Sequence, residues 1–196
     1  MKERTTKIYD WATEKANSPY APLWIGVLFF LELFLFIPLD AILLFFCLHN
    51  PKKTFIYILT GAIASTLSAT IGYLIGHFLW DLVGSYIVPN FIAKISFDRI
   101  SDHFQLYESW TVFLGALTPF PIKALSLAAG VFQLGAISFA SYFLMGRLIR
   151  FALVGGACLI WGEKLKNFLN RHFHRVLFVI GAKMAVGFLL IWALSQ

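Results

Sequence analysis

The sequence has few charged residues. Asp, Glu, Lys and Arg make up 13% of its 196 residues, whereas hydrophobic residues make up 59%. Soluble domains carry about 25% charged residues, so this composition excludes an ordinary soluble domain. In lipid the backbone must satisfy its own hydrogen bonds, and a helix does so within one segment. The composition therefore predicts an all-α integral membrane protein, with no room for a separate soluble enzyme.

Cysteine is also scarce, with two residues in the whole chain. Cys47 and Cys158 both fall in apolar stretches and lack the spacing of metal ligands, so we interpret them as packing residues. The sequence contains no glycine loop for phosphate binding and no Ser-His-Asp arrangement. It predicts no metal, no cofactor and no enzyme activity. Because no small-residue cleavage site follows a short apolar core near the N-terminus, no cleavable signal peptide is expected.

Positive charge is in excess and lies at the ends of apolar segments. The formal net charge is +6, which in a soluble protein would suggest a nucleic acid partner. Here the basic residues are better explained by the positive-inside rule and by contact with anionic headgroups. No nucleic acid partner is expected, and the basic N-terminal tail and residues 164–175 are placed on the cytoplasmic side.

Three segments are long and apolar enough to cross a bilayer, which takes roughly 20 residues. They are residues 54–80, residues 136–161 and the last stretch of residues 163–196, which follows a basic linker. Two other segments, residues 1–22 and 86–108, are amphipathic and are expected to lie in the membrane interface. About three full transmembrane helices are therefore expected, together with interfacial helices.

Two further apolar stretches, residues 23–50 and 110–132, are interrupted. The interrupting residues are Glu32, Pro38 and Asp40 in the first stretch and Pro119, Pro121 and Lys123 in the second. Proline removes a backbone donor and clashes with the preceding turn, so neither stretch should form one smooth helix. We expect each to be a re-entrant helical hairpin, since freed backbone groups are tolerated inside protein or beside a watery cavity. The alternative is that both stretches cross the membrane fully. Residues 52–53 and 81–108 would then exchange sides, and because each segment has two Lys or Arg residues, the positive-inside rule does not decide between the two arrangements.

The two interrupted stretches resemble each other at an offset of 83 residues. Residues 37–44 (IPLDAILL) align with residues 120–127 (FPIKALSL), so that Asp40 and Lys123 occupy the same position. The offset also aligns the spans and the amphipathic segments of the two halves. A hairpin returns to its own side while a span crosses, so the second half is expected to be inverted. Interrupted segments at matching places in inverted halves are typical of transporter binding sites, although a match this short also arises by chance.

Five charged residues in apolar sequence form the candidate site. They are Glu32, Asp40, Lys123, Arg147 and Arg150. A charge at the bilayer centre costs about 2.5–3.5 kcal/mol, so all five need pairing or hydration. Two acids against three cations leave positive charge over, which suits phosphate because Arg binds it in a bidentate manner. The structural alternatives are snorkelling of the two arginines to the interface and capping of a helix by Asp40.

These residues carry a resemblance to a known family. The chain resembles the DedA family, also called the VTT or SNARE-associated domain, and within it the YqaA-type branch. The segments that carry the resemblance are Glu32, residues 36–40 (FIPLD), 72–76 (GYLIG), 118–123 (TPFPIK), 129–131 (AGV) and 146–151 (GRLIRF). The resemblance implies two membrane-embedded re-entrant hairpins, with the acids of the first hairpin and the basic residues of the second as the functional set.

The resemblance also implies a function. It implies a lipid flippase or scramblase for phosphate-bearing lipids, such as phospholipid or polyprenyl phosphate, linked to proton motive force. The implied location is the bacterial cytoplasmic (inner) membrane, with a cytoplasmic N-terminus. Two alternatives stay open: a proton-coupled exporter of ions or cationic drugs, and a scaffold that transports nothing. The sequence does not determine the oligomeric state.

Overall fold

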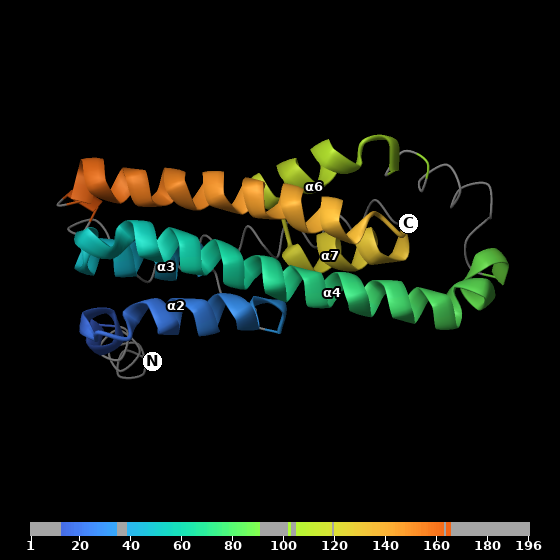
Figure 1. Cartoon of the computed structure of the whole chain (residues 1–196), viewed down its shortest axis with the longest axis horizontal. Helices are drawn as coiled ribbons and strands as arrows, with labels where there is room; N and C mark the ends of the chain where they lie inside the picture. Colours follow the sequence, from blue (N-terminus) through green and yellow to red (C-terminus); the bar gives the residue numbers. More distant parts are fainter. Residues whose placement is uncertain are drawn as a thin grey trace. The chain divides into compact units, whose positions relative to one another are not determined.

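The computed structural model describes residues 13–34, 39–90, 102, 105–118, 120–162 and 164–165, with the side chains of residues 83–90 excepted. Within these residues every regular element is helical (Figure 1). Contacts divide the chain into two units. The first unit comprises Met1–Ala64 with Phe151–Gln196, and the second comprises Ser65–Arg150. Each unit is described separately.

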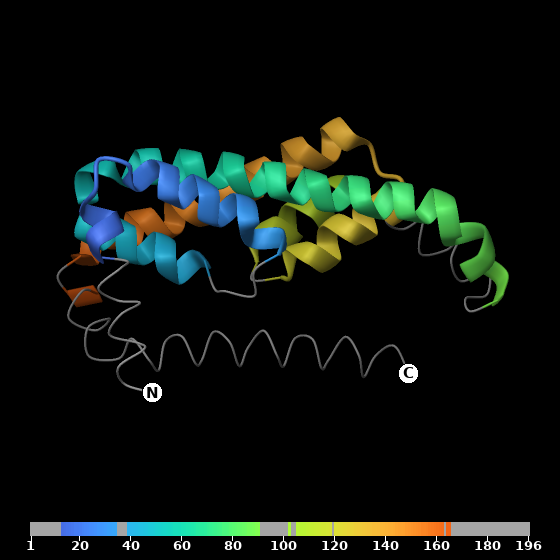
Figure 2. The same cartoon turned by 90° about the horizontal axis from the view of Figure 1, so that it is seen from below.

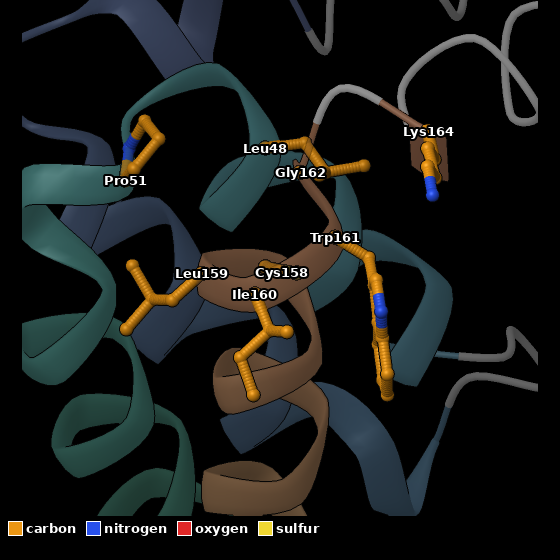
Figure 3. Close-up of a pocket in the computed structure, with 8 residues that line it drawn as sticks. All are labelled: Leu48, Pro51, Cys158, Leu159, Ile160, Trp161, Gly162 and Lys164. Carbon is orange, nitrogen blue, oxygen red and sulfur yellow. The ribbon is translucent and has the colours of Figure 1, made fainter.

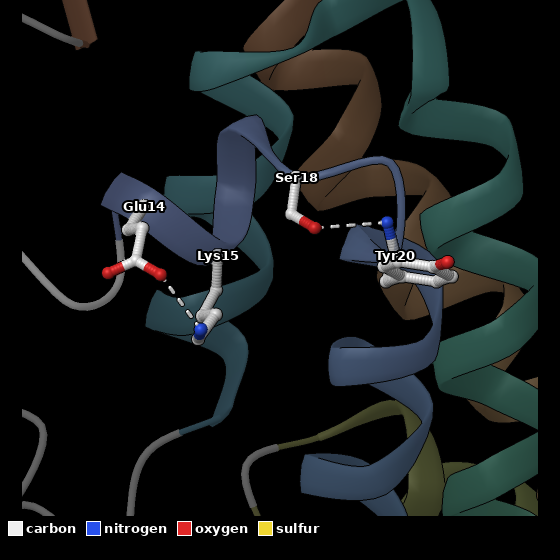
Figure 4. Close-up of polar contacts among 4 residues, drawn as sticks. All are labelled: Glu14, Lys15, Ser18 and Tyr20. Carbon is white, nitrogen blue, oxygen red and sulfur yellow. Dashed lines mark hydrogen bonds and ion pairs between the residues drawn. The ribbon is translucent and has the colours of Figure 1, made fainter.

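The first unit begins with a helical turn at residues 13–17 and a polar connection into α2 (Ala21–Phe30). The Ser18 hydroxyl accepts a hydrogen bond from the Tyr20 amide at 3.2 Å, which orders the turn before α2 (Figure 4). Lys15 Nζ lies 2.9 Å from Glu14 Oε1 and 5.3 Å from the centre of the Trp24 ring. These contacts fix the direction in which the apolar helix starts.

Two short helices follow one another on either side of the first interruption. A 3₁₀ turn, η1 (Leu31–Leu33), extends α2, and α3 covers Leu39–His49. Figures 1 and 2 show that the chain reverses direction between α2 and α3, and residues of the two helices contact each other. A second 3₁₀ turn, η2 (Pro51–Lys53), then leads into α4 (Thr54–Asn90).

Aromatic side chains form the core of the first unit. The ring of Phe29, from α2, packs edge-on against Phe151 with centroids 4.9 Å apart. Phe46 of α3 packs edge-on against Tyr57 of α4 at 5.9 Å. At Gly61 an added Cβ would lie 3.4 Å from the Phe151 ring, at ordinary van der Waals contact distance. Aromatic pairs of this kind stabilise packing beyond the area they bury.

The second unit has the same order of elements. Two short helices, α6 (Glu108–Leu117) and α7 (Ile122–Val131), contact each other, and the chain reverses between them (Figure 1). The helix Ala136–Gly162 follows and contributes its residues up to Arg150 to this unit. The buried core is apolar and comprises Ala69, Tyr73, Val112, Ala116, Ile122, Leu125, Ala129, Leu134, Phe139 and Phe143.

Glycine brings α7 against α4 in the second unit. A Cβ on Gly130 would lie 2.1 Å from the Tyr73 carbonyl oxygen, and one on Gly76 would lie 2.3 Å from that of Leu127. Gly76 belongs to a stripe of small residues at helical spacing, all of them buried: Gly61, Ser65, Ala69, Gly72 and Gly76. Small residues of this kind allow helices in membranes to pack at short distance.

Two helices are long and apolar enough to cross a membrane, Pro51–Leu82 and Ala136–Gly162. Only 50% and 33% of their most apolar windows are buried inside the protein. Large apolar side chains such as Leu67, Phe78 and Leu153 are instead exposed. A core helix of a soluble protein would bury these side chains. In a membrane they can stay exposed, because lipid tails are as apolar as the side chains themselves.

The predicted all-helical class with membrane-type helices is confirmed in the described residues. The end of the first long helix differs from expectation, because α4 continues to Asn90 rather than ending near Trp80. The start of the predicted interfacial segment, residues 86–108, therefore belongs to the same helix. Pro38, Pro119 and the predicted C-terminal span lie outside the described residues.

Candidate functional site

The two predicted acids lie in the first unit, at opposite kinds of helix end. Asp40 is in the first turn of α3 and is half-buried. The positive end of the α3 dipole stabilises its carboxylate. Glu32, also half-buried, lies in η1 after the C-terminal end of α2.

Lys123 lies in the first turn of α7, in the second unit, and is half-buried. α7 starts 83 residues after α3, so Lys123 occupies the same place in its helix as Asp40. The residue before α7 is Pro121, which has no side-chain acceptor to cap the helix. The positive end of the α7 dipole and the Lys123 ammonium therefore add to one another. Such a helix start attracts an anion.

Arg147 is a buried cation on the helix Ala136–Gly162. Its side chain is 3% exposed, and the guanidinium carbon lies 5.3 Å from the centre of the Phe143 ring. The preceding residue, Gly146, packs against α6, since an added Cβ would lie 2.7 Å from the Phe113 carbonyl oxygen. Arg147 is thus held within the second unit. Protein atoms therefore cover the side chain of Arg147.

Arg150 binds the backbone where α6 ends. Its Nη1 donates to the carbonyl oxygens of Leu117, at 3.4 Å, and Thr118. In a continuous helix the Leu117 carbonyl would accept from residue 121, but Pro121 has no N–H. Thr118 is extended, as expected for a residue before proline. Arg150 therefore supplies a donor to the Leu117 carbonyl in place of the one that Pro121 lacks, and it also binds the Thr118 carbonyl within the break.

The predicted site residues are divided between the units. Lys123, Arg147 and Arg150 belong to the second unit, and Glu32 and Asp40 belong to the first. Each residue lies on or beside an apolar helix, and the basic set shares the unit that contains the second break.

The structure adds polar contacts to which sequence analysis assigned no role. His77 Nε2 lies 3.8 Å from Asp81 Oδ2, and Gln133 Nε2 donates to Asp81 Oδ1 at 3.4 Å. The spacing of His77 and Asp81, four residues on one helix, was the only signal for this pair. Gln133 joins them because its backbone has φ 53° and turns the chain after α7. Among the described residues no group of three or more His, Cys, Asp or Glu side chains is placed to hold a metal.

Comparison with known proteins assigns the family. The model of the VTT domain matches residues 24–158, which is more than half of the chain. The chain belongs to the VTT domain family. An uncharacterized protein of Haemophilus influenzae is 30% identical over 165 residues, covering 84% of this chain and 85% of that protein. An uncharacterized protein of Histophilus somni is 29% identical over 158 residues, covering 80% and 82%.

VTT proteins, the DedA family, are associated with membranes and are linked to transport or flippase roles. They are not a family of enzymes. The matched residues, 24–158, contain all five residues of the candidate site and both interrupted stretches except residue 23. No solved structure matches the chain.

Proposed function

We propose that this VTT protein moves phosphate-bearing lipids across the bilayer, and that the start of α7 binds the phosphate group. The observation that carries the proposal is Lys123 in the first turn of an apolar helix preceded by proline. A cation opposes the dipole at a helix start by about 0.3–1 kcal/mol. A bound phosphate would reverse that cost, because backbone N–H groups and the ammonium would both contact it.

The arginines support the same substrate class. Arg147 keeps a permanent positive charge buried in the unit that contains Lys123. Arg150 holds the carbonyl groups of the break and so keeps the start of α7 separate from the end of α6. Positive charge at membrane depth favours an anionic headgroup over a cationic drug, since a cation would be repelled by it.

The acids divide into two roles. Asp40 stabilises α3 from its first turn as an anion. Glu32 is half-buried in the 3₁₀ turn before the first break, and we assign it the gain and loss of a proton. We propose that Glu32 links lipid movement to the proton motive force across a bacterial cytoplasmic membrane, with the N-terminus in the cytoplasm.

The short helices support a re-entrant arrangement. α2, α6 and α7 each have 10 residues and α3 has 11, and 10 residues span roughly 15 Å. The hydrocarbon core is about 30 Å thick, so none of these helices crosses it alone. We propose that each pair enters and leaves on one side, and that the two halves are inverted with respect to each other. The equal order of elements at an offset of 83 residues supports this repeat.

Purified protein in liposomes tests the substrate class. Two fluorescent lipids with the same chains would be compared, one with a phosphate headgroup and one with a neutral sugar headgroup. Dithionite added outside bleaches only the outer leaflet, so the fraction bleached reports movement. We expect fast movement of the phosphate lipid alone, and a large loss of the pH-gradient dependence in Glu32→Gln.

The alternatives give different results in the same liposomes. A proton-coupled exporter would acidify or alkalise the lumen on addition of its substrate without moving either lipid. A scaffold would do neither. Movement of both lipids at equal rates would overturn the role assigned to the start of α7.

A further inference from the structure

The only two cysteines of the chain meet inside the first unit, although they are 111 positions apart. Cys47 lies in α3 and Cys158 in the helix Ala136–Gly162. Both are free thiols, 0% and 2% exposed, and the two thiols act on one another electrostatically. Cys158 Sγ also lies 3.7 Å from the carbonyl oxygen of Leu44, one turn before Cys47. The thiols are therefore neighbours across two helices.

Two hydroxyl groups of α4 border this thiol pair. Thr54 is buried, and its hydroxyl has no hydrogen-bond partner among the described residues. Tyr57, three residues later on the same face, is fully buried, and its hydroxyl has no hydrogen-bond partner among the described residues. Hydroxyl donors stabilise a thiolate, which is the form of cysteine that reacts. The hydroxyl groups of Thr54 and Tyr57 can therefore donate to a thiolate, which apolar side chains at these positions could not do.

A cavity of about 540 Å³ reaches Cys158 at the end of its helix (Figure 3). Trp161 and Lys164 line the same cavity, together with Leu48 from the end of α3. Cys47 is not among the residues that line it. A small oxidant in the cavity would therefore meet Cys158 before Cys47.

We propose that Cys47 and Cys158 are a redox-sensitive pair, which hydrogen peroxide converts to a disulfide that ties α3 to the helix Ala136–Gly162. The sulfur of the Cys158 thiol attacks one oxygen of the peroxide, an S–O bond forms, and the O–O bond breaks. The hydroxide released takes the thiol proton and leaves as water. This first step produces a sulfenic acid on Cys158.

Cys47 completes the reaction. The sulfur of its thiol attacks the sulfur of the Cys158 sulfenic acid, the S–S bond forms, and the S–O bond breaks. The departing hydroxide takes the Cys47 proton and leaves as a second water. The pair loses two electrons, and one hydrogen peroxide becomes two waters. A dithiol reductant reverses the change by thiol–disulfide exchange.

The disulfide would restrain the helix that carries Asp40. Asp40 is in the first turn of α3 and Cys47 is seven residues later on the same helix. Fixing α3 to a second helix limits any movement of α3 during transport. This effect on transport rests on the proposed function, whereas formation of the disulfide does not.

Peptide mapping tests the disulfide directly. Trypsin cuts after Lys and Arg, so Cys47 falls in the peptide of residues 16–52 and Cys158 in that of residues 151–164. The full chain in detergent would be treated with hydrogen peroxide and then with N-ethylmaleimide. We expect a linked pair of peptides, two hydrogen atoms lighter than their sum, which dithiothreitol separates. The oxidised protein should also melt about 5–10 °C higher.

The Cys47→Ser variant is the matched control. Its Cys158 has no second thiol, so the sulfenic acid should advance to sulfinic acid on the peptide of residues 151–164. Circular dichroism of the reduced variant would show that its helices are intact. In the wild-type protein, labelling of both cysteines by N-ethylmaleimide after peroxide treatment would overturn the proposal, provided that the protein remains folded during that treatment. A disulfide without any change in lipid movement would keep the redox pair and remove its link to transport.

Discussion

Arg150 shows how one side chain serves a break in a membrane helix. Proline at positions 119 and 121 leaves carbonyl groups at the end of α6 without helical donors. An unsatisfied carbonyl in lipid costs several kcal/mol. The guanidinium of Arg150 donates to Leu117 and Thr118, and its own charge is compensated by these carbonyl dipoles. These hydrogen bonds therefore lower both the free-energy cost of the unsatisfied carbonyl groups and the free-energy cost of placing the charge among apolar residues.

Replacing Arg150 should consequently lower stability. We expect Arg150→Gln to cost about 2 kcal/mol, because hydrogen bonds to a charged donor are lost. Thermal unfolding in detergent should then fall by about 4–8 °C. The melting temperature of Arg150→Lys should lie between those of wild type and Arg150→Gln, since an ammonium keeps the charge but lacks the planar fork of the guanidinium. Lys52→Gln, at an exposed position, serves as the control, and equal melting of Arg150→Gln and wild type would contradict this role.

Packing of α7 against α4 depends on the absence of a side chain. At Gly130 an added Cβ would meet backbone atoms of Tyr73 and His77 at 2.1 and 2.7 Å, and backbone cannot move aside as a flexible side chain can. We expect Gly130→Ala to destabilise the protein by about 3 kcal/mol through overpacking. A Cβ on Gly156, also in a helix, meets nothing within 4 Å. Gly156→Ala should leave stability unchanged or raise it by up to about 1 kcal/mol; similar melting of the two variants would disprove the contact.

The first helical hairpin makes a prediction about sidedness. Single cysteines at Asn17 and Lys52, in a Cys47→Ser, Cys158→Ser background, mark the two ends of the first interrupted stretch. If α2 and α3 re-enter, an impermeant maleimide should label both positions from the cytoplasmic side only. The measurement compares inside-out and right-side-out vesicles. Labelling of the two positions from opposite sides would mean that this stretch crosses the membrane.

Local sequence signals located the breaks well but not the ends of every helix. Proline restricts its own backbone and that of the residue before it, so α7 begins directly after Pro121. Hydropathy ended the first span at Trp80, whereas α4 continues to Asn90. Hydropathy measures transfer into lipid, but a helix continues until its backbone bonds are interrupted or capped.

Contacts between distant residues were beyond the sequence. Arg150 was assigned to substrate because a charge in apolar sequence has no visible partner. Its partners are backbone carbonyl groups more than thirty residues away, and every residue has such a group, so no residue type signals them. The meeting of Cys47 and Cys158 likewise depends on how α3 and a later helix pack. Burial of the small-residue stripe in α4 was predictable because it follows from helical spacing alone.

At the scale of the whole molecule, the described residues combine an apolar surface with charged side chains at the ends of short helices. Large apolar side chains are exposed along both long helices, as expected for a protein surrounded by lipid. Charges are placed at the ends of short helices, where dipoles and freed backbone groups act on them. A polar headgroup crossing the bilayer meets the same cost as these side chains. A protein that already stabilises charge at membrane depth is therefore suited to carry one.

The role of Lys123 is tested most directly by the rate at which a phosphate-bearing fluorescent lipid changes leaflet in proteoliposomes. Lys123→Gln removes the charge at the start of α7 and keeps the side chain's length and polarity, and Lys52→Gln removes an exposed charge outside the apolar helices. If Lys123 binds the phosphate group, we expect a rate at least tenfold lower for Lys123→Gln, a largely retained rate for Lys123→Arg, and a wild-type rate for Lys52→Gln. Wild-type movement by folded Lys123→Gln protein would contradict it.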